Sequence, residues 1–220
     1  NSALYGRTAI GGSVNLRTAD PTPRHQGNVE FTTGQFNTLK GIGRLSGAGS
    51  NWGGYYVSVG KEQNSGYFKN LTTDDYSVGN TALFGKLTFN PDPKSFGSIS
   101  LNYVDSSNST PTNEPHIDGR LLHDIDPQFD RFSNFNIPGP NYNQNELRLT
   151  VNYDRQLSSW ARMTEVFGYR DVLQEFVDDG DFIGSPFDLA ASTVTQYPFS
   201  QKLDENVFFQ ELRFELKPKV

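Results

Sequence analysis

The chain has 220 residues, of which 35% are hydrophobic and 13% aromatic, and it contains no cysteine, which excludes disulfides, thiol catalysis and cysteine metal sites. Its net charge of -6, with 19 dispersed basic residues, argues against a nucleic-acid partner. No apolar run approaches the roughly 20 residues of a membrane helix, so any contact with a membrane must be made by strands.

Apolar side chains fall on every second position in successive segments from Asn28 onward, the period of a strand with one apolar face. The pattern predicts eight strands, at residues 27–35, 39–47, 54–63, 81–90, 96–105, 145–155, 160–175 and 206–217. In the sixth, Leu147, Leu149, Val151 and Tyr153 are expected to share a face with Ile99, Leu101 and Tyr103 of the fifth. Glu146, Arg148, Thr150 and Asn152 are expected on the opposite face.

The predicted connections alternate between short and long. Tight turns are expected after the second, fourth and sixth strands, and long loops at residues 64–80, 106–144 and 176–206. In an up-and-down antiparallel sheet this order places every long loop at one end, which is typical of outer-membrane β-barrels. The short connection at residues 36–38 is the exception.

Aromatic residues recur near the ends of the predicted strands. In an outer-membrane barrel such residues form girdles at the two membrane interfaces. The candidates are Trp52, Tyr55, Phe89, Phe96, Tyr103, Tyr153 and Trp160.

Residues 2–16 carry a motif with many spaced positions, Ser-Ala-Leu-Tyr-Gly-Arg-Thr-Ala-Ile-Gly-Gly-Ser-Val-Asn-Leu. This stretch resembles the end of the plug domain in TonB-dependent outer-membrane receptors. The matching residues are Ser2, Leu4, Tyr5, Gly6, Ala9, Gly11, Gly12, Val14 and Asn15. Physically, paired glycines let the backbone lie close to another surface, and Tyr5, Arg7 and Asn15 supply polar contacts.

The resemblance implies an all-β fold in which residues 1–20 end a plug domain and residues 21–220 begin a transmembrane up-and-down β-barrel. About eight of the roughly 22 strands of such a barrel would then be present. It also implies an outer-membrane location in a Gram-negative bacterium and active uptake of a scarce solute, such as a siderophore, cobalamin or a glycan. The implied partners are outer-membrane lipid, the TonB complex and a small solute or metal chelate.

Ligand contacts are expected from aromatic residues of the two longest loops, namely Phe132, Phe135, Tyr142, Phe182 and Phe187. The histidines and aspartates between residues 116 and 126 match no zinc or calcium spacing, so we expect neither a metal nor another cofactor. No catalytic motif is present, and we expect no enzymatic activity.

A second hypothesis is a secreted or cell-surface β-sheet module for carbohydrate binding or adhesion. Such a module must bury its alternating apolar residues between two layers, whereas a barrel wall exposes them on one side of a single sheet.

Overall fold

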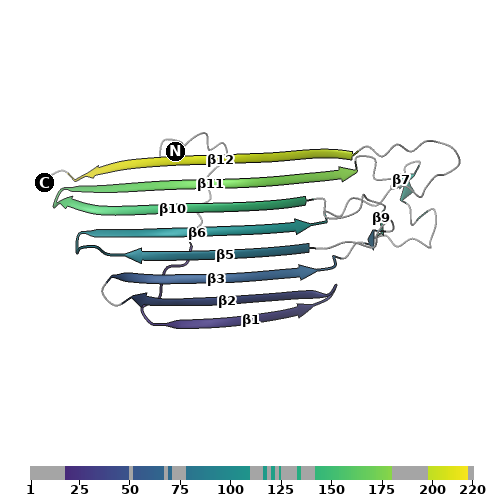
Figure 1. Ribbon diagram of the computed structural model, residues 1–220, viewed down its shortest axis with the longest axis horizontal. Coiled ribbons are helices and arrows are strands. Elements are labelled where there is room, and N and C mark those ends of the chain that lie inside the picture. The colour runs from purple at the N-terminus through teal and green to yellow at the C-terminus, as the bar shows by residue number, and fades with distance from the viewer. Residues whose placement is uncertain are drawn as a thin grey trace.

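The computed structural model describes residues 18–49, 52–66, 69–70, 78–109, 116–117, 120–121, 124, 133–134, 142–179 and 198–217. Strands dominate these ranges, as Figure 1 shows. In the same ranges, no helix is long and apolar enough to cross a membrane. The residues of the plug-like motif lie outside the described part of the chain.

Eight strands form one antiparallel sheet, and each of the eight pairs with the next of the eight in chain order. They are β1 (Gln26–Gly34), β2 (Thr38–Gly49), β3 (Gly53–Asn64), β5 (Val78–Phe89), β6 (Ser95–Asn108), β10 (Tyr142–Ser158), β11 (Ala161–Asp179) and β12 (Pro198–Leu216). The sheet is therefore up-and-down, and it is open at β1 and β12 (Figure 1).

Two short strand pairs lie beyond the right-hand end of the sheet in Figure 1. In one, β4 (Lys69–Asn70) runs parallel to β9 (Ser133–Asn134). In the other, β7 (His116–Ile117) is antiparallel to β8 (Arg120–Leu121). The first pair joins two of the long connections, because its strands come from different ones.

All eight predicted strands are confirmed, but several are longer than predicted. Residues 106–108 and 142–144, which we expected in a loop, pair with one another and extend β6 and β10. They are polar on both faces, so the apolar alternation stops while the backbone hydrogen bonds continue. The last strand likewise begins at Pro198 rather than at residue 206.

The expected sorting of the connections is also confirmed. The strands that flank residues 65–77, 109–141 and 180–197 meet these connections at the right-hand side of Figure 1, which we call the long-loop end. The strands that flank the short connections 50–52, 90–94 and 159–160 meet these connections at the opposite side, the turn end.

The one short connection at the long-loop end is the tight turn between β1 and β2. Phe36 and Asn37 have positive φ angles of 57° and 53°, and the Thr38 amide donates to the Gln35 carbonyl at 3.1 Å. Two positive φ angles are characteristic of the type I′ turn that suits a hairpin. The Ser65 amide and hydroxyl both donate to the Phe36 carbonyl at 2.8 Å, which fixes this turn against the end of β3.

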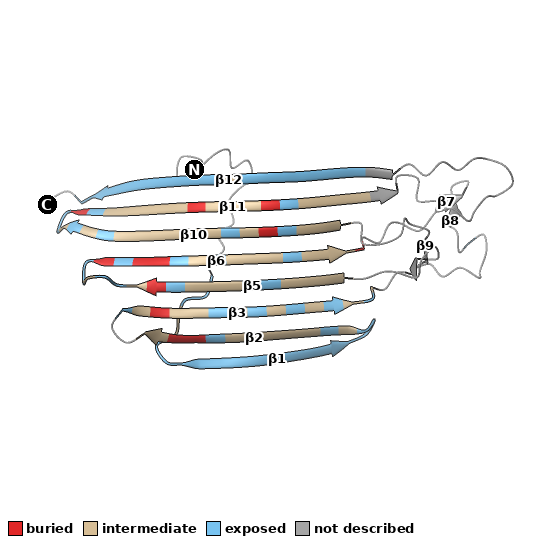
Figure 2. Cartoon of the chain, viewed as in Figure 1, coloured by how far each residue is buried: buried red, intermediate tan, exposed pale blue. Residues whose placement is uncertain are grey.

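Register divides the side chains between two faces, as predicted. Leu149 lies directly opposite Leu101, and Val151 opposite Ile99, so these residues share one face, which we call the apolar face. The intervening residues of each strand lie on the other side, the polar face. Among the described residues, only Ala161 and Val172 are buried apolar side chains, so no packed core lies against either face (Figure 2).

Gly53, at the start of β3, gives a test of the sheet geometry. Its φ of +145° is a backbone conformation that residues with a side chain rarely adopt. An added Cβ would also collide with the Thr88 carbonyl. We expect Gly53→Ala to lower the free energy of unfolding by about 2–4 kcal/mol. Urea unfolding in detergent micelles, followed by tryptophan fluorescence, measures this change.

Gly85, in β5, is the matched control, because an added Cβ there would meet nothing within 4 Å. Gly85→Ala should change the free energy of unfolding by less than about 0.5 kcal/mol. Equal losses in the two variants would contradict the described start of β3.

Asp92 gives a pH-dependent test in the turn between β5 and β6. The Lys94 amide and the Ser95 hydroxyl donate to its carboxylate and lower the pKa of Asp92 from its usual 3.8. Because the folded pKa is depressed, the stabilisation is present above pH 3.8 and is lost as the pH falls through the folded pKa. Asp92→Asn should therefore weaken the loss of stability below about pH 4 in urea titrations. An unchanged acid response would refute this role.

Candidate functional site

The apolar face carries a belt of exposed apolar side chains that crosses all eight strands. One row of residues that lie directly opposite one another on successive strands starts at Phe208 of β12. From there it continues through Tyr169, Leu149, Leu101, Gly85, Val57, Leu45 and Gly27. Several of its members are strongly exposed, including Phe208 at 64% and Leu45 at 52%. Such a continuous exposed apolar surface is not expected of a protein that meets only water.

The belt runs obliquely to the strands. On β1 its apolar residues, Val29 and Phe31, lie on the long-loop side of the row through Phe208. On β12 it extends to the turn side of that row, through Leu212, Phe214 and Leu216. The centre of the belt thus shifts by about one residue per strand. With a rise of about 3.4 Å per residue and about 4.8 Å between strands, a belt parallel to a membrane requires strands tilted by about 35°. Membrane barrels tilt their strands by about 35–45°.

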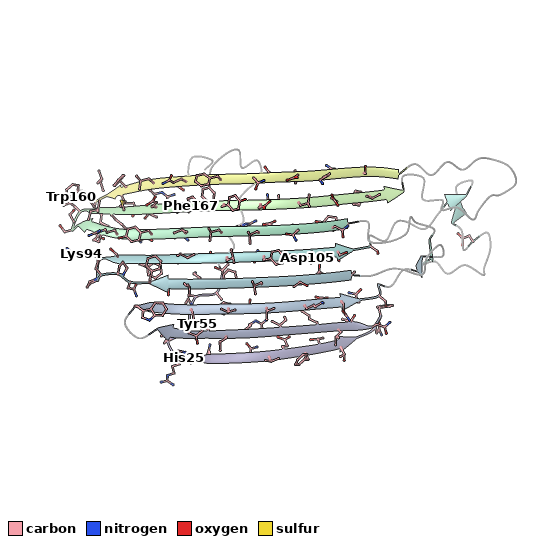
Figure 3. The ribbon with its side chains drawn as sticks, in the orientation of Figure 1. His25, Tyr55, Lys94, Asp105, Trp160 and Phe167 are labelled. Atoms are coloured by element: carbon pink, nitrogen blue, oxygen red, sulfur yellow. The ribbon has the colours of Figure 1, made fainter. Side chains whose placement is uncertain are left out.

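Charged residues of the apolar face lie mainly at the borders of the belt. Asp105, labelled in Figure 3, and Asp171 lie toward the long-loop end, and Arg155 lies toward the turn end. Glu165 is an exception, because it pairs with Tyr153 inside the belt. The Gln210 amide donates to the Glu165 carboxylate at 2.8 Å, so this carboxylate has a partner on the same face.

Most of the predicted girdle residues lie near the turn end of the sheet. Tyr55, Phe89 and Tyr153 are on the apolar face near the turns, and Trp52 and Trp160 are in the turns themselves (Figure 3). Tyr103 is on the same face nearer the long-loop end, where it accepts a hydrogen bond from Asn145 at 2.9 Å. The inclusion of Phe96 is wrong, because Phe96 pairs with Asp154 on the polar face.

The polar face holds most of the ion pairs of the sheet. Adjacent strands contribute opposite charges, as in Lys40–Glu62 at 3.2 Å and Arg162–Asp154 at 2.9 Å. Other pairs on this face are Arg44–Glu30, Lys86–Asp20, Arg148–Glu146, Arg170–Glu146, Arg170–Glu205 and Arg213–Glu211. The face therefore presents charge that is largely neutralised within the sheet.

Glu146 organises the most buried of these charges. Arg148 and Arg170 lie directly opposite one another on β10 and β11, an arrangement of like charges that destabilises a sheet. The Glu146 carboxylate accepts from Arg148 at 2.6 Å and from Arg170 at 3.1 Å, and Glu146 is only 7% exposed. Arg170 also contacts Glu205 at 3.5 Å. One carboxylate thus holds two arginines together on the polar face.

Residues 20–25 lead into β1 at the turn end, and we call this segment the tether. Its first three residues lie on the polar face. Asp20 forms an ion pair with Lys86 of β5 at 2.5 Å. Pro21 lies over Gly54 of β3, where a Cβ on Gly54 would meet the Pro21 ring at 2.7 Å. The first part of the tether therefore lies on the polar face, whereas His25 at its end lies beside Tyr55 on the apolar face.

Thr22 continues the tether onto β2. Its amide donates to the Ser46 hydroxyl at 2.9 Å, and the two hydroxyls lie 3.0 Å apart. Ser46 is only 4% exposed and donates in turn to the Tyr55 carbonyl. The tether thus contacts three neighbouring strands in succession, β5, β3 and β2.

Most of the predicted site residues fall outside the described part of the chain. These are Ser2, Leu4, Tyr5, Gly6, Arg7, Gly11, Gly12 and Asn15 of the motif, together with Phe132, Phe135, Phe182 and Phe187 of the loops. Tyr142 is described, and its placement in a loop is wrong. It is the first residue of β10, pairs with Asn108 and Phe176, and donates to the Gln144 side chain at 2.6 Å.

Sequence reasoning missed both the Glu146 cluster and the tether contacts. Alternation places Glu146 and Arg148 on one face, but their partner Arg170 is found only through the register of β10 with β11. Asp20 and Lys86 are 66 residues apart, and no local pattern links them. In the described part of the chain, no group of three or more His, Asp or Glu residues could hold a metal ion.

Substitution of Glu146 tests whether this carboxylate holds the two arginines. Glu146→Gln removes the charge at nearly constant volume and leaves Arg148 and Arg170 facing one another. We expect the free energy of unfolding to fall by about 1–3 kcal/mol, measured by urea unfolding in micelles. The control is Glu62→Gln, where the ion pair with Lys40 is more exposed, at 34% for the Glu62 side chain. Its loss should be about 0.5 kcal/mol or less. Equal losses would show that Glu146 has no special role.

Comparison of the chain with protein-family models, with curated proteins and with solved structures finds no match.

Proposed function

We propose that the chain is part of an outer-membrane β-barrel receptor of the TonB-dependent type, which takes up a scarce solute. The observation that carries the membrane part of the proposal is the oblique, uncovered apolar belt. The receptor part depends on the resemblance of residues 2–16 to the end of a plug domain.

The belt supports a lipid environment on energetic grounds. Apolar surface left in water costs about 25 cal/mol per Å², and large side chains such as Phe31 and Phe208 are 78% and 64% exposed. The two faces of the sheet differ, since charge is paired on one and apolar side chains are uncovered on the other. Lipid against the apolar face and water or protein against the polar face would give the side chains of each face a favourable environment.

The arrangement of connections supports a receptor with its ligand-binding region at the long-loop end. All three long connections leave the sheet at that end, and β4 and β9 join two of them by a parallel pairing. On this proposal the long loops and the plug capture a siderophore, cobalamin or a glycan. Uptake then proceeds by binding and plug rearrangement, driven through TonB, without covalent chemistry.

The tether gives independent support for a domain inside the barrel. Residues 20–22 lie on the polar face, which would be the lumenal side of a barrel wall. A domain that precedes the first strand would then be connected to the wall from inside. We therefore assign residues 1–20 to the plug and residues 21–220 to the wall of a barrel of about 22 strands.

A pair of neighbouring substitutions tests the lipid-facing assignment. Leu149 lies near the centre of the belt, and Thr150 is the next residue on the polar face. Leu149→Arg should lower the free energy of unfolding in bilayer vesicles by about 2–4 kcal/mol, as arginine does on the lipid face of a barrel near the midplane. Thr150→Arg should cost less than about 1 kcal/mol, because its side chain would face water or protein. Similar losses would favour the soluble module.

The transport function is tested in cells that carry the complete parent protein. Uptake of radiolabelled ferric siderophores, cyanocobalamin and oligosaccharides is compared between the parent strain and a strain that lacks the gene. We expect at least one solute to lose uptake that depends on the proton-motive force. Unchanged uptake of every probe, in a strain that otherwise takes them up, would contradict the assigned solute classes.

A further inference from the structure

We propose that the tether, residues 20–25, is held by its own contacts, mainly those of residues 20–22 on the polar face, and stays bound when the segment before residue 18 is displaced. The functional consequence rests on the proposed function: a plug that rearranges would do so from a fixed point on the barrel wall. The tether itself is defined by contacts among described residues.

The contacts of the tether are numerous for its length. Asp20 pairs with Lys86, whose side chain is only 13% exposed, while the Asp20 side chain is half exposed. Thr22 makes two contacts to the hydroxyl of the buried Ser46. At its far end, Nδ1 of His25 lies 3.0 Å from the Tyr55 hydroxyl on the apolar face, so the tether is also held where it enters β1.

The tether also has little conformational freedom to lose on binding. Pro21 and Pro23 restrict φ at two of its six positions and lack amide hydrogens that would need partners. The Thr22 hydroxyl donates to the Arg24 carbonyl at 2.9 Å, which satisfies one backbone group within the tether. A short, restricted segment with several side-chain contacts can remain bound without help from a neighbouring segment.

Cysteine cross-linking reports the bound state of the tether directly. The hydroxyls of Thr22 and Ser46 are 3.0 Å apart, close enough for a disulfide in the double variant Thr22→Cys, Ser46→Cys. The chain has no cysteine of its own, so no other thiol of the chain competes. The matched control is Thr22→Cys, Ser100→Cys. Ser100 is on the same face and in the same row as Ser46, through Tyr56 and Lys86, but three strand spacings away, about 14 Å.

The experiment is a urea series on the full-length parent protein in micelles. Disulfide yield after brief oxidation reports the tether, trypsin cleavage after Arg17 reports release of the preceding segment, and tryptophan fluorescence reports the sheet. We expect cleavage after Arg17 to begin at a lower urea concentration than loss of the disulfide. At that concentration the yield should remain above about nine-tenths of its value in buffer, and the control pair should give little disulfide throughout.

Two results would overturn the inference. In one, disulfide yield falls together with the appearance of cleavage after Arg17, which would show that the preceding segment holds the tether in place. In the other, all three signals change at the same urea concentration, which would make the segment, tether and sheet one cooperative unit. The proposed function is checked separately by heat-modifiable gel migration. Its absence would count against a barrel, and the cross-linking yields would still decide the inference.

Discussion

The pairing of each strand with its neighbour is the interaction on which the rest of the structure depends. Backbone hydrogen bonds fix the register of β6 against β10, and side chains alternate along each strand, so register alone decides that Leu149 and Thr150 face opposite ways. A slip of one residue would exchange the two faces. Because the described residues form no second layer, this sorting is not corrected by core packing. It must be specified by the pattern of each strand and by its turns.

The two faces place different demands on the sequence. On the polar face, charges from adjacent strands neutralise one another, and most of these pairs are too exposed to stabilise the sheet strongly. Glu146 differs because it is buried between two arginines, where loss of the carboxylate would leave like charges in contact. On the apolar face the requirement applies to the belt as a whole rather than to single residue pairs. If the belt faces a membrane, it must keep its position relative to the bilayer while the strands tilt, and this would account for the shift of its residues along each successive strand.

Most of the sheet could be predicted from the sequence, because the alternation of residues such as Leu147, Leu149 and Val151 is a local signal. The ends of β6 and β10 could not, because Ser106, Ser107 and Gln144 are polar whichever face they occupy. The Glu146 cluster requires the register between strands, and the tether requires contacts between residues more than 60 positions apart. Local pattern thus predicts the strands, while the sites depend on how the strands are aligned.

The open edges constrain what can lie beside this sheet in a membrane. All nine residues of β1 are exposed, and β12 presents an edge of 19 residues. Each unpaired backbone group in hydrocarbon costs several kcal/mol, so a bare edge of that length would exceed the roughly 5–15 kcal/mol that stabilises a whole domain. If the belt faces lipid, both edges must therefore pair with further strands. In that case the oblique belt also specifies the strand next to β12. Its apolar residues must lie about one residue nearer the turn end than those of β12, because the belt shifts by that amount from each strand to the next.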